Sequence, residues 1–231
     1  MKLGILKTGQ PPRSLADHFP GYPEMIQGVL GSGYDYRTFD VQAGALPQPG
    51  DADAYIVTGS AAGVYDDLPW IEPLRAWLRG VDPELPVMGI CFGHQIMADA
   101  YGGKVIKSDK GWGGGLQDYA VLQHEPWMEG AGKTFAIPAS HQDQVVEAPP
   151  TARVIAGNDF CPNAGLVYTG RRAASFQGHP EFSPAYAGAL VDLRHRKGII
   201  DDATSARLHD SLTRPNDNNL VGAWIRNFCA R

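Results

Sequence analysis

The strongest constraint on the fold is a short apolar run that ends at Cys91, between two glycines. The run predicts a buried strand over Val87–Ile90, and the residues after it predict a helix beginning near Gly93. A side chain at so sharp a strand-to-helix junction is held out at the carboxyl end of the strand, often on strained backbone. Gly89 and Gly93 let neighbouring chain approach without a Cβ clash. We therefore expect Cys91 at the edge of a parallel sheet where open α/β folds bind ligands.

Strands and helices alternate through the first part of the chain, which favours a parallel sheet covered on both faces. Predicted strands are Lys2–Lys7, Asp35–Asp40, Ala54–Thr58 and Val87–Ile90, and predicted helices are Tyr22–Leu30, Trp70–Gly80 and Gly93–Tyr101. Short strand candidates follow at Lys104–Lys107, Tyr119–Leu122, Thr134–Ile137, Gln144–Glu147, Arg153–Gly157 and Leu166–Thr169. Helices are expected again at Pro184–Arg196, Ala203–Leu212 and Asn218–Phe228, the last with a core-facing apolar stripe.

This order of elements predicts an α/β fold with an open, mostly parallel sheet, helices on both faces and antiparallel additions. No internal repeat or low-complexity linker interrupts it, so one domain over residues 1–231 is expected. The glycine-rich run Gly111–Gly115 does not sit between a strand and a helix. We expect it to form a flexible turn near the site and not a phosphate loop. Its Trp112 would either wall the pocket or pack within the loop.

Cys91 combines the features of a nucleophilic thiol. The helix that follows would point its N-terminus at the sulfur, and its partial positive charge favours thiolate over thiol. The amide of Phe92 would face an oxyanion formed by attack on a carbonyl. A lone cysteine in such a turn is also compatible with simple burial. The flanking glycines and the motif described next favour catalysis.

A second motif, Gly178–Glu181, supplies a histidine and a carboxylate. In an extended segment His179 and Glu181 would share one face, because they are two residues apart. The carboxylate can then accept a hydrogen bond from one imidazole nitrogen while the other faces the thiol. Pro180 restricts the chain and keeps His179 out of helical geometry. Alone, this motif also fits a solvated loop; together with Cys91 it predicts a Cys-His-Glu triad.

Four segments resemble the class I, or triad-type, glutamine amidotransferases. They are Gly89–Gln95 (Gly-Ile-Cys-Phe-Gly-His-Gln), Gly178–Phe182 (Gly-His-Pro-Glu-Phe), Ser140–Val145 (Ser-His-Gln-Asp-Gln-Val) and Thr58–Ser60 (Thr-Gly-Ser). The first two are specific, and the other two gain weight because all four follow the family's order. The resemblance covers most of the chain and implies the family's flavodoxin-like α/β fold.

The resemblance also implies a role for each matching position. Cys91 would attack the side-chain amide of glutamine and form a γ-glutamyl thioester. His179 would protonate the departing ammonia and then activate water, while Glu181 orients His179. The amides of Gly59 and Phe92 would hold the oxyanion. Positions that would bind the glutamine portion are Gln95, Ser140, His141, Gln142 and Asp143.

Gln142 departs from the family pattern, because the guanylate-forming members have glycine at this position. A larger side chain there would narrow or reshape the pocket, so the substrate is either glutamine or another γ-glutamyl compound. The chain also lacks the Ser-Gly-Gly-Val-Asp-Ser type loop of a fused synthetase and a phosphate loop. The implied partner is therefore a separate synthetase subunit that takes up the ammonia. The alternative is a stand-alone γ-glutamyl peptidase or γ-glutamylamide hydrolase with the same triad.

Composition narrows the remaining function classes. A net charge of −5 argues against a nucleic-acid partner, and no apolar run approaches the roughly 18 residues that span a bilayer. The first strand is too short for a signal peptide, and three distant cysteines fit a reducing cytoplasm. No cofactor is implied, and the other histidines lack ligand spacing, so no metal site is expected. A non-catalytic regulatory or binding module, and another class of thiol enzyme, remain as alternatives.

Overall fold

Five parallel strands form one half of the central sheet in the computed structural model, which describes residues 1–230. The sheet has nine strands in the order β2-β1-β3-β4-β11-β10-β9-β6-β7. The parallel strands are β1 (Lys2–Lys7), β2 (Asp35–Asp40), β3 (Ala54–Val57), β4 (Val87–Ile90) and β11 (Ala173–Phe176). All residues of β3, β4 and β11 are buried, as expected for strands covered on both faces. The predicted α/β fold is confirmed.

Strand β11 was not predicted from the sequence. Its residues, Ala-Ala-Ser-Phe, include no β-branched side chain and give a weak strand signal. Pairing fixes it instead: β11 runs parallel to β4, with Phe176 opposite Ile90, and antiparallel to β10. This placement brings the chain just after Phe176 next to the chain just after Ile90.

Antiparallel strands complete the sheet, in agreement with the prediction. They are β6 (Gly113–Val121), β7 (Thr134–His141), β9 (Ala152–Gly157) and β10 (Gly165–Tyr168), while β5 (Lys104–Lys107) and β8 (Asp143–Glu147) form a separate pair. The flexible turn expected at Gly111–Gly115 is wrong for its last three residues, which begin β6 and pair with β7. A Cβ on Gly113 would lie 2.5 Å from the Phe160 ring, so close packing explains this glycine.

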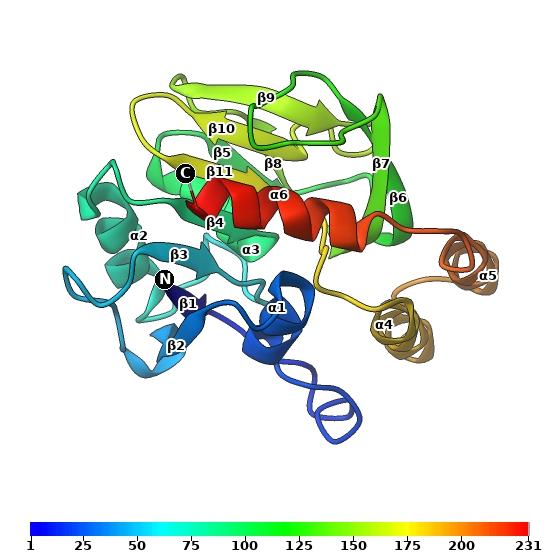
Figure 1. Cartoon of the computed structure of the whole chain (residues 1–231). Helices are drawn as coiled ribbons and strands as arrows, with labels where there is room; N and C mark the ends of the chain where they lie inside the picture. Colours follow the sequence, from blue (N-terminus) through cyan, green and yellow to red (C-terminus); the bar gives the residue numbers. More distant parts are fainter. Residues whose placement is uncertain (231) are drawn as a thin grey trace.

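Helices cover both faces of the sheet (Figure 1). Helices α1 (Tyr22–Leu30) and α6 (Asn218–Ala230) lie on one face, and α2 (Ile71–Gly80) and α3 (Phe92–Ala100) lie on the other. The predicted stripe on α6 is confirmed, since Trp224 and Ile225 are fully buried in the main core. Burial of such a side chain stabilises the fold by about 1.5–3 kcal/mol. Trp224 Nε1 also donates to the Glu129 carbonyl at 2.9 Å.

Two further helices, α4 (Pro184–Arg196) and α5 (Asp202–Ser211), form a hairpin beside β6 and β7 (Figure 1). Ser183 caps α4 by accepting a hydrogen bond from the Tyr186 amide, and Asp201 caps α5 by accepting one from the Thr204 amide. Gly198, at a φ of +66°, reverses the chain between them. The hairpin therefore follows directly from the segment that carries His179.

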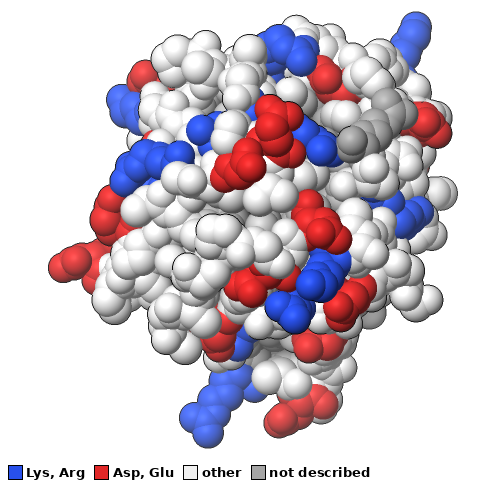
Figure 2. Space-filling model, turned by 60° about the vertical axis from the view of Figure 1, so that its left-hand side comes forward, with Lys and Arg blue, Asp and Glu red and all other residues white. Residues whose placement is uncertain are grey.

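Surface charge and helix length bear on the expected partners. Basic and acidic side chains are interspersed on the face shown in Figure 2, without a continuous basic patch. Within residues 1–230, no helix combines the length and apolar content needed to cross a bilayer. The predicted domain ends at Arg231, which lies outside the described residues, and the one-domain organisation stays a prediction.

Candidate active site

Cys91 occupies a strained junction between β4 and α3. Its φ of 52° is the single positive value at a non-glycine position in the described part of the chain. Such backbone costs on the order of 1–3 kcal/mol and persists where the surroundings enforce it. Here a Cβ on Gly93 would lie 2.3 Å from the Val57 carbonyl oxygen, and one on Gly89 would lie 2.6 Å from the Gly93 carbonyl carbon. The junction is thus packed backbone against backbone, as the sequence predicted.

The end of β11 carries His179 to the same edge of the sheet. The Cys91 amide donates to the Phe176 carbonyl at 2.9 Å, and the His179 amide donates to the Pro138 carbonyl at 2.7 Å. The extended segment expected around Pro180 is wrong, since Phe182 N–H closes a turn onto the His179 carbonyl at 3.3 Å. The turn still directs the Glu181 carboxylate onto the imidazole, with Nδ1 to Oε1 at 2.7 Å.

Charge inside the site favours a protonated imidazole. Burial lowers the pKa of His179, but the Glu181 carboxylate and a Cys91 thiolate outweigh burial and raise this pKa to about 10. Both side chains of the His179–Glu181 pair are almost completely buried. Because Nδ1 contacts Glu181, Nε2 is the ring nitrogen left for the thiol. The arrangement can accept a proton from a thiol and donate it to a leaving group.

A stacked aromatic ring holds the imidazole from one side. The Phe182 ring lies parallel to the His179 ring, with centroids 3.8 Å apart and an interplanar angle of 7°. Asn218 Nδ2 donates to the Phe182 carbonyl at 2.7 Å, and the Tyr186 ring meets the Phe182 ring edge-on at 4.6 Å. Sequence reasoning gave Phe182 and Tyr186 no place in the site. The adjacency of Phe182 to Glu181 was the available signal.

The two predicted oxyanion residues flank the thiol. A Cβ built on Gly59 would lie 3.0 Å from His179 Cε1 and 3.7 Å from Cys91 Cβ, so this loop directly borders the site. The Gly93 amide donates to the Thr58 carbonyl at 3.2 Å, which ties the loop to the junction. Phe92 is the first residue of α3, where an amide has no partner within its own helix. The structure therefore brings Gly59 and Phe92 to Cys91.

Several of the predicted substrate-binding residues meet at the Asp143 carbonyl. Gln95 Nε2 donates to the Asp143 carbonyl at 2.9 Å, and His141 Nδ1 lies 3.1 Å from the same carbonyl oxygen. Burial lowers the pKa of His141 to about 4, so this imidazole is neutral. The half-buried Ser140 pairs with Gly114 across β6 and β7.

Gln142 is positioned differently from the other predicted substrate-binding residues. Its Nε2 donates to the Ser108 carbonyl at 3.1 Å, and its own carbonyl accepts from the Ser108 amide at 3.2 Å. Both ends of the residue are therefore tied to the segment that precedes β6. The Gln142 side chain, which departs from the family pattern, therefore anchors the segment that precedes β6.

Burial keeps the other two cysteines and His94 from taking part in this chemistry. Burial raises the pKa of Cys161 and of Cys229 to about 12, so both remain thiols at neutral pH. His94 is fully buried, and its Nδ1 lies 2.8 Å from Ser175 Oγ, which fits the expected packing role. Among residues 1–230 no group of three or more His, Cys, Asp and Glu side chains is arranged to hold a metal.

Known proteins resemble this chain in sequence and in fold. The family model of class-I glutamine amidotransferases matches residues 37–191. Gamma-glutamyl peptidase 3 of Arabidopsis thaliana is 30% identical over 91% of this chain and 89% of that protein. A glutamine amidotransferase structure from Thermotoga maritima covers 100% of this chain and 99% of its own, with a TM-score of 0.76 at 17% identity. The chain belongs to the class-I glutamine amidotransferase family.

A third relative matches a smaller part of the chain. It is one of the subunits of the glutamine-hydrolysing GMP synthase of Methanopyrus kandleri, and it is 37% identical over 46% of this chain and 57% of that protein.

Proposed function

We propose that the chain hydrolyses a γ-glutamyl amide through a covalent thioester on Cys91. The observation that carries this proposal is the strained Cys91 beside a buried His179 whose Nδ1 lies 2.7 Å from Glu181. A thiol nucleophile, its base and an orienting carboxylate are the parts that acyl transfer requires. Family membership supports the γ-glutamyl specificity.

The reaction divides into two steps. The Cys91 thiolate attacks the γ-carbonyl carbon, the C–N bond breaks, and the leaving amine takes its proton from the His179 imidazolium. His179 then accepts a proton from water as that water attacks the thioester, which releases glutamate and restores the thiolate. The amides of Gly59 and Phe92 stabilise the oxyanion of each tetrahedral intermediate. Glu181 keeps the imidazole oriented and stabilises its positive charge.

With glutamine as substrate the leaving group is ammonia, which a separate synthetase subunit would consume. The match to the Methanopyrus kandleri GMP synthase protein supports such a partner, since that protein is by name one part of an assembly. The match covers less than half of this chain. Three free cysteines, all buried, support a reducing compartment such as the cytoplasm.

A γ-glutamyl peptide is the second candidate substrate. The alignment with gamma-glutamyl peptidase 3 spans 91% of this chain, roughly twice the share matched by the GMP synthase protein. The chemistry at Cys91 is the same for both substrates. Only the leaving group differs, and therefore only the part of the site that receives it.

Ammonia release from glutamine and amine release from γ-glutamyl dipeptides test the proposal. We expect Cys91→Ala to abolish turnover, a loss of about 10³-fold or more. Cys161→Ala and Cys229→Ala are the matched controls and should retain turnover, because these thiols are buried away from the triad. Turnover that survives Cys91→Ala contradicts the assignment, as does a wild type inactive on every γ-glutamyl compound tested.

A glutamine-like chloroketone gives an independent readout of the pocket. We expect it to label the wild type once per chain, at Cys91, and excess glutamine to slow the labelling. Labelling of Cys161 or Cys229 at a comparable rate contradicts the proposal.

A further inference from the structure

We propose that Arg194 binds a carboxylate on the leaving-amine side of the substrate, and so selects γ-glutamyl peptides over glutamine. This inference rests on the proposed function and adds a specificity-determining residue to it. Arg194 lies on α4, which begins three residues after Glu181. No motif in the sequence singles it out.

Within the described residues, Arg194 is a cation without a carboxylate partner. Its contacts there are a hydrogen bond from Nη1 to the Leu190 carbonyl at 3.0 Å and stacking on Trp112, with Cζ 3.8 Å from the ring centroid. Stacking on an aromatic face orients a guanidinium and leaves its N–H groups free to bind an oxyanion. Burial lowers the pKa of Arg194 to about 10, which keeps it charged at neutral pH. A half-buried, oriented guanidinium is a suitable receptor for a carboxylate.

The position of Arg194 assigns it to the leaving-group side. Arg194 lies about two helical turns after Tyr186 on α4, and Tyr22, Tyr186 and Cys91 oppose the larger effect of burial on its pKa. Tyr186 packs on Phe182, and Phe182 stacks on His179, the residue that protonates the leaving amine. Helix α4 therefore covers the His179 side of the thiol. Of the residues predicted to hold the glutamyl portion, Gln95 lies on α3 and Asp143 at the start of β8, while Ser140 and His141 end β7 opposite the first residues of β6.

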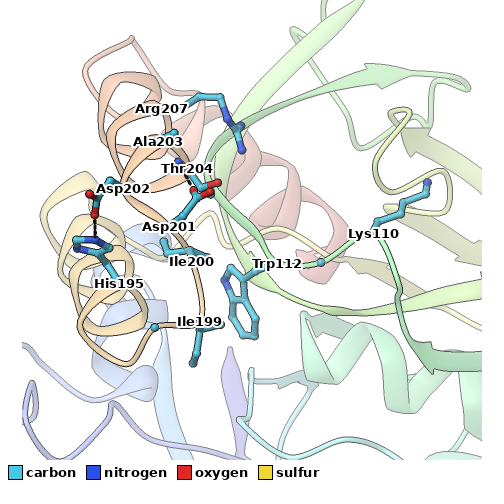
Figure 3. Close-up of a pocket in the computed structure, with 12 residues that line it drawn as sticks. Lys110, Trp112, His195, Ile199, Ile200, Asp201, Asp202, Ala203, Thr204 and Arg207 are labelled. Atoms are coloured by element: carbon cyan, nitrogen blue, oxygen red, sulfur yellow. Dashed lines mark hydrogen bonds and ion pairs between the residues drawn. The ribbon is translucent and has the colours of Figure 1, made fainter.

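A pocket borders Trp112, the ring on which Arg194 stacks, and in this proposal it receives a leaving group larger than ammonia. Trp112, which stacks on Arg194, also lines this pocket of about 1020 Å³ together with the α4–α5 connection. Figure 3 shows the Trp112 indole projecting toward Ile199 and Ile200 of that connection. Lys110 and Arg207 lie elsewhere on the wall. Ammonia needs no such space, whereas the amino-acid part of a γ-glutamyl peptide does.

The test compares γ-glutamylglycine with its C-terminal amide, because the two differ by one charge at nearly constant shape. We expect the wild type to prefer γ-glutamylglycine by kcat/KM. Arg194→Met should lower kcat/KM for γ-glutamylglycine about 10- to 100-fold and change that for the amide less than about threefold. Arg194→Lys should retain part of the preference. Arg196→Met is the matched control on the same helix, since Arg196 is exposed.

Thermal unfolding of each variant verifies that α4 is intact. Equal losses on the two substrates, or a wild type without preference, overturn this inference. A wild type that hydrolyses glutamine but neither glycine compound also overturns it and leaves the proposed function standing. Absence of Cys91-dependent hydrolysis of all three compounds overturns both.

Discussion

Around Cys91 the chain is held by backbone atoms, whereas around His179 it is held largely by side chains. Backbone hydrogen bonds and two glycines without room for a Cβ enclose the thiol. The imidazole instead rests on the Phe182 ring and on the Glu181 carboxylate. A nucleophile fixed in this way cannot be moved without disturbing the core. The base depends on side-chain contacts that substitutions can change one at a time. Substitutions around His179 should therefore test activity, and substitutions around Cys91 should test stability.

The largest expected effect is on the side held by side chains. His179→Gln should lower kcat about 10²- to 10⁴-fold, because it removes the group that transfers protons. Glu181→Gln should lower kcat less, since this side chain orients the imidazole and transfers no proton itself. Steady-state kinetics with the best γ-glutamyl substrate measure both, with thermal unfolding as the control for folding. Equal or reversed losses in folded variants contradict these roles.

Substitutions around Cys91, where backbone atoms hold the chain, should change the stability of the protein. Gly93→Ala places a Cβ 2.3 Å from the Val57 carbonyl oxygen, and such overpacking costs about 1–3 kcal/mol or more. Gly28→Ala is the matched control: Gly28 lies within α1, and a Cβ there meets nothing within 4 Å. It should be neutral or stabilise by up to about 1 kcal/mol. Urea unfolding of both variants checks the difference, and similar midpoints would show that the junction tolerates displacement.

A pH dependence of stability is also expected on the side held by side chains. Folding raises the pKa of His179 from 6.5 to about 10, through Glu181 and Cys91 against the opposing effect of burial. A group whose pKa is raised on folding contributes stability that is complete below its unfolded pKa and lost as pH rises through its folded pKa. The wild type should therefore lose stability relative to His179→Gln between pH 6.5 and about 10. Urea unfolding across this range measures it, and parallel pH curves for the two proteins contradict it.

The sequence was most informative where local geometry decides the structure. An apolar run ending in Gly-Ile-Cys-Phe-Gly predicted the β4–α3 junction, because strand length and the glycines leave few alternatives. The pairing of His179 with Glu181 was predicted for an extended segment, but the chain achieves it in a turn. Either conformation can bring residues two apart together, so the pairing is a more secure prediction than the backbone shape.

Long-range pairing determined what the sequence did not reveal. Strand β11 has small residues with weak strand preference and exists because β4 and β10 lie on either side of it. The glycines that begin β6 resemble a turn in sequence, yet β7 pairs with them. The stacking of Phe182 on His179 and of Arg194 on Trp112 joins residues whose relative positions depend on the whole fold. No local pattern encodes such contacts.

The position of α6 has a consequence for how the protein folds as it is made. Every strand of the sheet precedes α6 in the chain, yet Val221, Trp224 and Ile225 fill the main core. During translation the sheet therefore leaves the ribosome with the part of one apolar face that α6 covers still exposed. Folding as a unit has to wait for the residues after Asn218, and a nascent chain stalled before them exposes a surface that chaperones and proteases recognise. Packing of α6 onto the sheet therefore completes the main core.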